Sequence, residues 1–414
     1  MAAAKKTTTR KRTSSASASA LAKFEEQFAK EFGEGVLLTP KIKAYEVVST
    51  GSLTLDAALG CGGTIVGRIT EIWGPPNTGK TTMAMITAAN YQQQYPNRVV
   101  GWIDVEHSWD NDWAKAHGLD IDRVRKTEPA TAQDVSDHAK FMVRSGLFSL
   151  IVIDSIGGMI GRSEVEKDAD DAAVAEVARV VTRMVKYQAH QLTVHKTGLW
   201  IINQPRSNIG SYGGGSTTGG GNALKHVSTH KIRMRLTNTS PYMVSSKPED
   251  GEAGFEVAAH VERNKVAPPK KVATFGLFNQ DTDQWGPMGI DRASEALRLG
   301  IRFGIIASPS KGWYQLPDRE VRTNGEAKVL DALRESPELV EQVRAEILSR
   351  SAEEVEEVLP DIPAAEGTEE PTEAPAPAQD AVTPGFRKGG GSKDEMDFDA
   401  DVLRAASNPE PVAS

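Results

Sequence analysis

The sequence predicts an α/β fold in which a mostly parallel sheet is flanked by helices, with a small C-terminal α/β domain beside it. Apolar, strand-like runs alternate with helical patterns between residues 49 and 276. A glycine-rich turn at residues 74–81 joins one such run to a helical segment. Both ends of the chain are strongly polar, so we expect the folded part to lie between them.

The 414-residue chain has a net charge of −8, which is unevenly distributed. Residues 1–20 hold five basic and no acidic residues, whereas residues 351–414 hold sixteen acidic and four basic ones. We expect a disordered basic arm and a disordered acidic tail, the latter serving as a linker or as a binding segment for a protein partner. A solvated arm is favoured over an organelle transit peptide because no apolar face accompanies its charges.

Residues 21–48 are predicted to form an N-terminal oligomerisation helix and a strand. Leu21, Phe24, Phe28 and Phe32 recur at helical spacing, so this helix must bury an apolar stripe on its own core or on a neighbouring subunit. No apolar run approaches the roughly 18 residues that span a membrane, and we expect a cytoplasmic protein without a membrane partner. One cysteine excludes a disulfide framework.

The core, residues 49–276, contains four candidate strands, at residues 68–73, 99–105, 149–154 and 199–203. Residues 277–350 are predicted to form the small C-terminal domain and to end in a helix at 337–349. The region between the two charged ends is nearly neutral, which argues against a globally basic nucleic-acid binder. Any contact with DNA must therefore come from local loops.

Residues 74–81 match the P-loop pattern G-x-x-x-x-G-K-[ST] and stand between a strand and a helix, as that motif requires. Backbone N–H groups of such a loop close around phosphate oxygens at a helix N-terminus. Lys80 adds positive charge, and Thr81 offers a hydroxyl to Mg²⁺. We therefore expect ATP to be bound by Gly74, Pro75, Pro76, Asn77, Thr78, Gly79, Lys80, Thr81 and Thr82.

Three carboxylates follow buried strand patterns. Asp154 ends one of them and is expected to hold Mg²⁺, through a water molecule. Glu106 follows another strand and could activate the water that attacks the γ-phosphate. Asp104 lies on the same strand face, and periodicity alone leaves the choice between these two open.

With these motifs the chain resembles the RecA family of homologous-recombination ATPases. The resemblance covers roughly residues 21–350 and includes the more specific runs Gly-Asn-Ala-Leu-Lys and Arg-Asn-Lys. The matching segments lie in the family's order at residues 49–53, 74–81, 103–107, 153–155, 202–204, 217–225 and 264–268.

The resemblance implies a role for several residues. Glu106 becomes the water-activating base, and Gln204 becomes the sensor of the γ-phosphate. Arg263 and Lys265 become paired cations that reach the next subunit's ATP, so that Lys80, Glu106, Gln204, Arg263 and Lys265 form the catalytic set. Asp110 and Trp113 are placed beside the adenine, although Trp113 could instead anchor a helix.

Residues 205–225 form a glycine-rich stretch that we expect to be a loop without regular structure, and such a loop is usually functional. The resemblance makes it the second DNA-binding loop, with contacts from Arg206, Asn208, Ile209, Gly210, Tyr212, Gly220, Gly221 and Asn222. It also implies a first DNA loop at 161–170, whose charge is negative. Arg179 and Lys186, seven residues apart on one helix face, are better candidates for phosphate contact, unless they merely form a solvated face.

The resemblance implies a bacterial-type or phage-encoded strand-exchange recombinase. Such a protein self-associates into a helical filament on single-stranded DNA and pairs that strand with homologous double-stranded DNA in recombination and repair. A ring helicase with the same core, or an accessory ATP-binding regulator of recombination, is the alternative.

Overall fold

The computed structural model describes residues 15–32, 45–162, 171–207, 216–239, 241–244, 251–282, 286–310, 312–316 and 323–357. Several expectations fall outside these residues: residues 1–14 of the arm, nearly all of the first DNA loop, the tail from residue 358, and Asn208, Ile209, Gly210 and Tyr212. Within the described part, no helix has both the length and the apolar character needed to cross a membrane.

The N-terminal helix α1 spans Ser15–Phe32 and belongs to a unit separate from residues 46–414. It starts six residues before the predicted helix, so residues 15–20 are helical and the expected disordered arm is shorter than 1–20. The rings of Phe24 and Phe28 lie 5.7 Å apart on its apolar stripe. Phe24 is half exposed.

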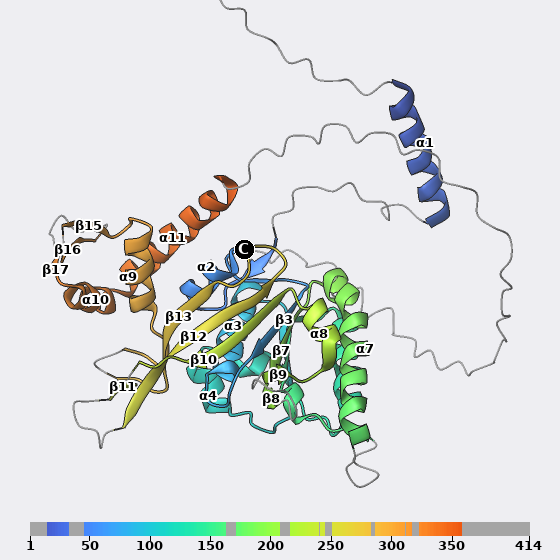
Figure 1. Cartoon of the computed structure of the whole chain (residues 1–414), viewed down its shortest axis with the longest axis horizontal. Helices are drawn as coiled ribbons and strands as arrows, with labels where there is room; N and C mark the ends of the chain where they lie inside the picture. The colour runs from blue at the N-terminus through green and yellow to red at the C-terminus, as the bar shows by residue number, and fades with distance from the viewer. Residues whose placement is uncertain are drawn as a thin grey trace, which may run out of the picture. The chain divides into compact units, whose positions relative to one another are not determined.

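The remainder is organised by one ten-stranded sheet (Figure 1). Six strands run parallel in the order β10–β3–β7–β6–β4–β5, and the four predicted strands are among them with ends within one residue of the prediction. Their bounds are Ile69–Trp73 (β3), Val99–Asp104 (β4), Val124–Thr127 (β5), Phe148–Asp154 (β6), Gly198–Asn203 (β7) and His230–Leu236 (β10). Antiparallel strands extend the sheet beyond β10: Tyr242–Met243 (β11), Glu252–Asn264 (β12), Val272–Phe278 (β13) and Gly289–Ile290 (β14).

Helices cover both faces of the central parallel strands β3, β7, β6 and β4, because these strands are apolar on both sides. One core contains Tyr91, Trp102 and Trp200, and the other contains Ile153 and Val185. The first core involves α2 (Leu53–Leu59), α3 (Lys80–Gln94) and α4 (Asn111–Ala116); the second involves α5 (Ala132–Ser145), α7 (Asp171–His195) and α8 (Gly221–Val227).

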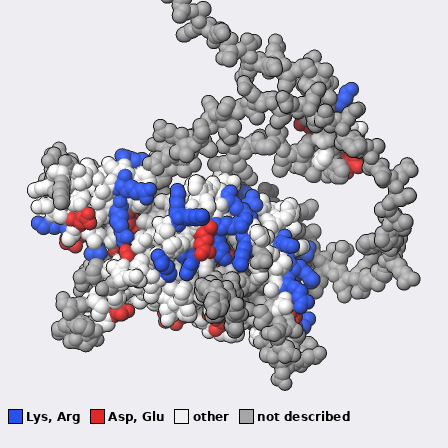
Figure 2. Space-filling model, in the orientation of Figure 1, with Lys and Arg blue, Asp and Glu red and all other residues white. Residues whose placement is uncertain are grey.

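The helices of the second core do not extend over β10 and β12. On β10, Ile232 and Met234 are buried, whereas Arg233 and Arg235 on the opposite face are exposed. Figure 2 shows basic side chains over this part of the sheet and, separately, over α7. A partly open, positively charged sheet face therefore lies beside the helices of the core.

The C-terminal domain has its own core, which contains Ala296, Leu333 and Val343. It consists of three helices and a small antiparallel sheet, with bounds Arg292–Arg302 (α9), Ala307–Ser310 (β15), Trp313–Gln315 (β16), Thr323–Asn324 (β17), Glu326–Glu335 (α10) and Pro337–Glu357 (α11). Two predicted boundaries need correction. Strands β13 and β14 belong to the large sheet, so the domain begins after Ile290 and not at 277; α11 continues to Glu357, past the predicted start of the tail at 351.

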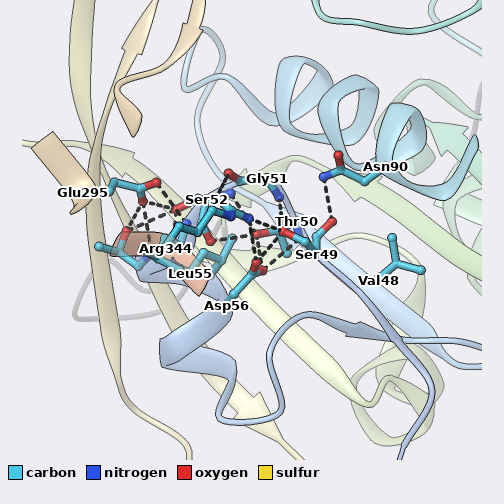
Figure 3. Close-up of polar contacts among 12 residues, drawn as sticks. Val48, Ser49, Thr50, Gly51, Ser52, Leu55, Asp56, Asn90, Glu295 and Arg344 are labelled. Carbon is cyan, nitrogen blue, oxygen red and sulfur yellow. Dashed lines mark hydrogen bonds and ion pairs between the residues drawn. The ribbon is translucent and has the colours of Figure 1, made fainter. Parts of the chain in front are cut away.

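The turn at residues 49–52, here called the docking turn, attaches this domain to the core (Figure 3). Glu295 of α9 accepts hydrogen bonds from the Ser52 hydroxyl and from the backbone N–H of Leu53, the latter at 2.9 Å. Arg344 of α11 donates to the carbonyl of Gly51 at 3.3 Å. Two helices of the C-terminal domain thus bind the same short turn.

The docking turn is braced from the core side by Asp56, which is fully buried. Its carboxylate accepts from the backbone N–H of Thr50 at 2.8 Å and from the Thr50 hydroxyl at 2.6 Å. Asn90 of α3 donates to the carbonyl of Ser49 at 3.0 Å. The turn therefore also contacts the helix that follows the P-loop.

Burial raises the pKa of the Asp56 carboxyl to about 6, against the opposing effect of the Ser49 and Thr50 hydrogen bonds. Because the folded protein binds this proton more tightly than the unfolded chain, the proton adds stability below about pH 4 that is lost as the pH rises through 6. The difference corresponds to about 3 kcal/mol at most.

We predict that Asp56→Asn, which carries no titrating proton, gains stability relative to the unsubstituted protein as the pH rises from 4 to 7. Denaturant unfolding at several pH values measures this difference. Asp112→Asn, at a residue whose side chain is 97% exposed, is the control and should show no such trend. Parallel stability curves for Asp56→Asn and the unsubstituted protein would contradict the proposed titration.

Candidate functional site

The predicted nucleotide-binding residues meet at the carboxyl ends of the parallel strands. The P-loop follows β3, Glu106 follows β4, Asp154 ends β6 and Gln204 follows β7. These four strands are parallel neighbours in the order β3–β7–β6–β4, so their carboxyl ends lie together. The structure thus brings residues that are up to 130 positions apart into one site.

The P-loop conformation depends on two glycines. Gly79 has φ = 77° and precedes α3, and a Cβ there would lie 2.3 Å from Leu277 Cδ2. A Cβ on Gly74 would lie 2.1 Å from the Met234 carbonyl oxygen. Lys80 is 8% exposed and donates to the Pro75 carbonyl at 2.7 Å. Burial lowers the pKa of the Lys80 ammonium, and Asp154 and Glu106 oppose this shift.

Thr81 and Asp154 lie together as a Mg²⁺ site requires. The Thr81 hydroxyl donates to Asp154 Oδ2 at 2.9 Å. Burial, together with the nearby Glu106 and Asp104, raises the pKa of the Asp154 carboxyl to about 7. Among the described residues there is no cluster of three metal-ligating side chains. One hydroxyl and one carboxylate beside a P-loop fit an ion whose other ligands are phosphate oxygens and water, as those of Mg²⁺ commonly are.

The structure distinguishes Glu106 from Asp104. Asp104 is fully buried, and its two oxygens accept from the backbone N–H groups of Ser108 and Trp109, each at 3.1 Å. Its bonds hold the turn after β4 in place. Glu106 is exposed just beyond the carboxyl end of β4, where it can reach a water molecule. Geometry thus favours Glu106 as the base.

Glu106 and Gln204 are hydrogen bonded to each other. Gln204 Nε2 donates to Glu106 Oε1 at 2.6 Å, and the Ser155 hydroxyl donates to the same oxygen. Sequence reasoning assigned no role to Ser155, Gly157 or Gly158. A Cβ on Gly157 would lie 3.3 Å from Gln204, and one on Gly158 would lie 3.2 Å from Glu106. The small residues after β6 leave room for the Gln204 and Glu106 side chains.

The structure gives Asp110 and Trp113 local roles at α4. Asp110 is the N-cap of that helix, and its carboxylate accepts from the Trp113 N–H at 2.8 Å. The Trp113 ring packs on the core and lies 4.6 Å from the His117 ring. These contacts support the helix-anchor interpretation of Trp113. Neither residue lines the cavity of about 390 Å³ nearby, which is lined by Trp109, Asn111, Ile121, Val124 and Lys126.

Arg263 and Lys265 lie two strands away from β3, the strand that leads into the P-loop. Arg263 is the second-last residue of β12 and Lys265 follows that strand. Lys231 of β10 pairs both with Arg263 and with Glu71, the middle residue of β3. At about 3.3 Å per residue, the rest of β3 puts Gly74 roughly 10 Å or more away. Burial, with a smaller effect of Arg263, lowers the pKa of the Lys265 ammonium.

The segment after Gln204 is more regular than predicted. β8 (Pro205–Ser207) pairs with β9 (Ser216–Thr218) as an antiparallel hairpin stem, which contradicts the expectation of a loop without regular structure across 205–225. α8 then includes Gly221 and Asn222. Gly220 is buried, and a Cβ there would lie 3.1 Å from Val181 of α7. Gly220 thus packs closely on α7, and its DNA contact stays a prediction.

Arg206 belongs to the β8 strand of this stem, at the base of the segment predicted to bind DNA. On α7, Arg179 and Lys186 are both exposed, as predicted. Arg183 lies between them on α7 and is also exposed. It was not identified from the sequence. The spacing of three and four residues could have identified it.

Comparison with known proteins decides the family. The model of the RecA N-terminal domain family matches residues 17–282. The chain belongs to the RecA family. It is 32% identical to the RecA protein of Thermus aquaticus over 78% of this chain and 91% of that protein. It is 33% identical to RecA of a Nocardioides species over 80% of this chain and 90% of that protein. It is 34% identical to RecA of Fusobacterium nucleatum over 77% of this chain and 81% of that protein.

RecA-family membership supports one of the functions considered from the sequence. The chain is a DNA-dependent ATPase and an ATP-dependent DNA strand-exchange recombinase. The ring-helicase and accessory-regulator alternatives are not supported. The fold agrees, because a mostly parallel sheet flanked by helices is the predicted core.

We predict that Glu106→Gln in this RecA-family chain keeps nucleotide affinity and fold stability but lowers the ATP hydrolysis rate by about a hundredfold or more, because it removes the proton acceptor. Asp104→Asn is the matched comparison. Its amide would face a backbone N–H of Ser108 or Trp109, so it should cost about 1–3 kcal/mol of stability. Hydrolysis that survives in Glu106→Gln but disappears in stably folded Asp104→Asn would reverse the assignment.

Proposed function

We propose that this chain binds ATP and Mg²⁺ at the carboxyl ends of the parallel strands. It uses Glu106 and Gln204 to couple ATP hydrolysis to DNA binding. The observation that carries the proposal is the 2.6 Å hydrogen bond between these two side chains. A glutamine amide that donates to the base can instead donate to a phosphate oxygen. Gln204 would then change partner when the γ-phosphate arrives and is lost.

The proposed roles at this site divide between charge and proton transfer. Residues 74–82 bind the phosphates through the Lys80 ammonium and through backbone N–H groups, which Pro75 and Pro76 lack. When bound, Mg²⁺ supplies charge neutralisation at the phosphates, and Thr81 and Asp154 would hold it, the latter through water. Glu106 orients a water molecule and accepts its proton. Asp110 and Trp113 remain our proposed neighbours of the adenine.

We place the second half of the ATP site on another copy of the chain. Arg263 lies two strands from β3 and three register positions before Gly74, so roughly 10 Å or more separates it from the P-loop of its own subunit. Arg263 and Lys265 are two residues apart, and Lys265 is exposed. Two neighbouring cations are suited to an anion that a second copy supplies. Head-to-tail contacts of this kind generate a helical filament.

Self-association also needs a partner for α1. Its apolar stripe includes Phe24, half exposed in the separate N-terminal unit. Large apolar side chains are exposed on α5 and α7, including Phe141 and Val194. We propose that α1 of one copy packs on the α5–α7 surface of the next. We also propose that the protein is cytoplasmic.

For DNA, we propose that single-stranded and double-stranded forms bind beside the hairpin stem and α7. Arg179, Arg183 and Lys186 form an exposed basic row on α7 (Figure 2). Residues 205–219 are here called the hairpin segment. Arg206 and the residues beyond it in this segment would bind DNA phosphates, and Ile209 would enter the base stack. Sequence recognition would be left to base pairing.

We predict that replacing Arg263 and Lys265 by Ala together leaves the fold intact but lowers DNA-stimulated ATP hydrolysis by about a thousandfold, because the transition-state charge loses its cations. Polymerisation with ATP should fall as well, as measured by light scattering. Lys80→Ala subunits should lack tight ATP binding but still present both cations. Mixing the two variants should restore part of the activity, and mixed filaments without any recovery would rule out cations shared between subunits.

We predict that deleting residues 358–414, which hold twelve acidic and four basic residues, strengthens binding to duplex DNA at low salt. A polyanionic segment competes with DNA for basic surfaces. The gain should shrink as salt increases, because the Debye length falls from about 10 Å at 0.1 M to about 3 Å at 1 M.

A full-length control with the tail's acidic residues changed to Asn and Gln separates charge from length. It should behave as the deletion does. Superimposable duplex titrations of all three proteins at low salt would refute competition and favour a tail that binds a protein partner.

A further inference from the structure

A buried ion pair lies in the middle of the large sheet. Glu71 of β3 and Lys231 of β10 are opposite each other in the strand register. Lys231 Nζ lies 3.2 Å from both carboxylate oxygens of Glu71, and the two side chains are 9% and 0% exposed. Glu71 is three residues before Gly74, the first residue of the P-loop.

One end of the hairpin segment is attached to this pair through Asn203. Asn203 ends β7, is fully buried, and donates from Nδ2 to Glu71 Oε1 and to the Gly219 carbonyl, both at 3.0 Å. Its Oδ1 accepts from the backbone N–H of Gln204 at 2.9 Å. The residue before the proposed sensor is therefore bonded both to the P-loop strand and to the far end of the hairpin segment.

The other end of the segment is attached through Lys231. Its ammonium donates to the Thr218 hydroxyl at 2.9 Å. Thr218 is the last residue of β9 and pairs with Pro205, the first residue of β8. Both strands of the stem are thus joined to one carboxylate and one ammonium.

Stability alone does not account for this arrangement. A buried ion pair loses hydration energy, and well-packed apolar residues often replace one without loss of stability. Glu71 Oε2 makes no hydrogen bond among the described residues, so this pair is also incompletely satisfied. Lys231 Nζ lies over the Trp73 ring, 5.1 Å from its centroid, and Trp73 directly precedes Gly74. The ammonium therefore also contacts the residue before the P-loop.

We propose that Glu71 and Lys231 are positioning residues that hold the two ends of the hairpin segment in one register with the P-loop strand. They thereby transmit the nucleotide state to the DNA-binding segment in addition to the direct route through Gln204. This inference rests on the proposed DNA-binding role of that segment. Because coupling between two ligands is reciprocal, the pair affects both the DNA stimulation of hydrolysis and the ATP stimulation of DNA affinity.

The test replaces the pair as a unit, because a single substitution would leave one buried charge unpaired. The double variant Glu71→Leu/Lys231→Met keeps apolar volume in the sheet. Lys231→Arg is the conservative variant, since a guanidinium can bond both Glu71 and Thr218. The control for lost stability alone is Arg334→Met, which breaks an ion pair at 3.5 Å in the C-terminal domain and leaves the buried Asp291 without this cation.

Two ratios are measured for each protein: ATP hydrolysis with and without poly(dT), and poly(dT) affinity with ATPγS and with ADP. In the double variant both ratios should fall about tenfold, within the usual range of coupling energies, while the affinity for a fluorescent ATP analogue without DNA stays within about twofold. Lys231→Arg should recover most of each ratio, and Arg334→Met should change neither. Unchanged ratios in the folded double variant would overturn the proposal.

If the double variant does not fold, Thr218→Val decides the question. It preserves shape and the ion pair but removes the bond from Lys231 to the end of β9. Both ratios should then fall by a smaller factor, and unchanged ratios would again overturn the proposal. A different failure is recognisable: an unsubstituted protein whose hydrolysis does not respond to poly(dT) would contradict the proposed function itself.

Discussion

The parallel alignment of β3, β7, β6 and β4 is the constraint on which the site depends. Each of these strands needs a return connection, so helices cover both faces and the chemistry is left to the residues just beyond the strand ends. The carboxyl ends of these strands carry the P-loop, Asp154, Glu106 and Gln204. Because β12 runs antiparallel to these strands, its carboxyl end, with Arg263 and the following Lys265, lies away from the P-loop.

Sequence reasoning succeeded where the signal is local. Strands buried on both faces are continuous apolar runs, which explains why four of them were located within one residue. The P-loop is likewise a contiguous motif. The Glu71–Lys231 pair could not be foreseen, because it depends on strand register across 160 positions. The choice between Glu106 and Asp104 required the turn after β4, whose N–H groups occupy the Asp104 carboxylate.

The two boundaries misplaced at the charged ends of the chain have a common cause. Charge and low apolar content were used to predict disorder, but they do not measure helix propensity. Residues 15–20 alternate serine with alanine, the best helix former, and residues 351–357 are mostly alanine and glutamate. Both segments continue a neighbouring helix, so they add residues to it without a new nucleus. The β8–β9 stem was missed for a different reason, since proline and glycines there are typical of a loop.

The separation of the P-loop from Arg263 and Lys265 has a consequence for the ends of an assembly. If each nucleotide site is completed by a neighbour, an open row of subunits always contains one fewer complete site than subunits. One terminal subunit then holds nucleotide without cations from a partner, and the other terminal subunit presents cations without a nucleotide to meet. The two ends are therefore chemically different, which gives growth and loss of subunits a direction even though every copy is identical.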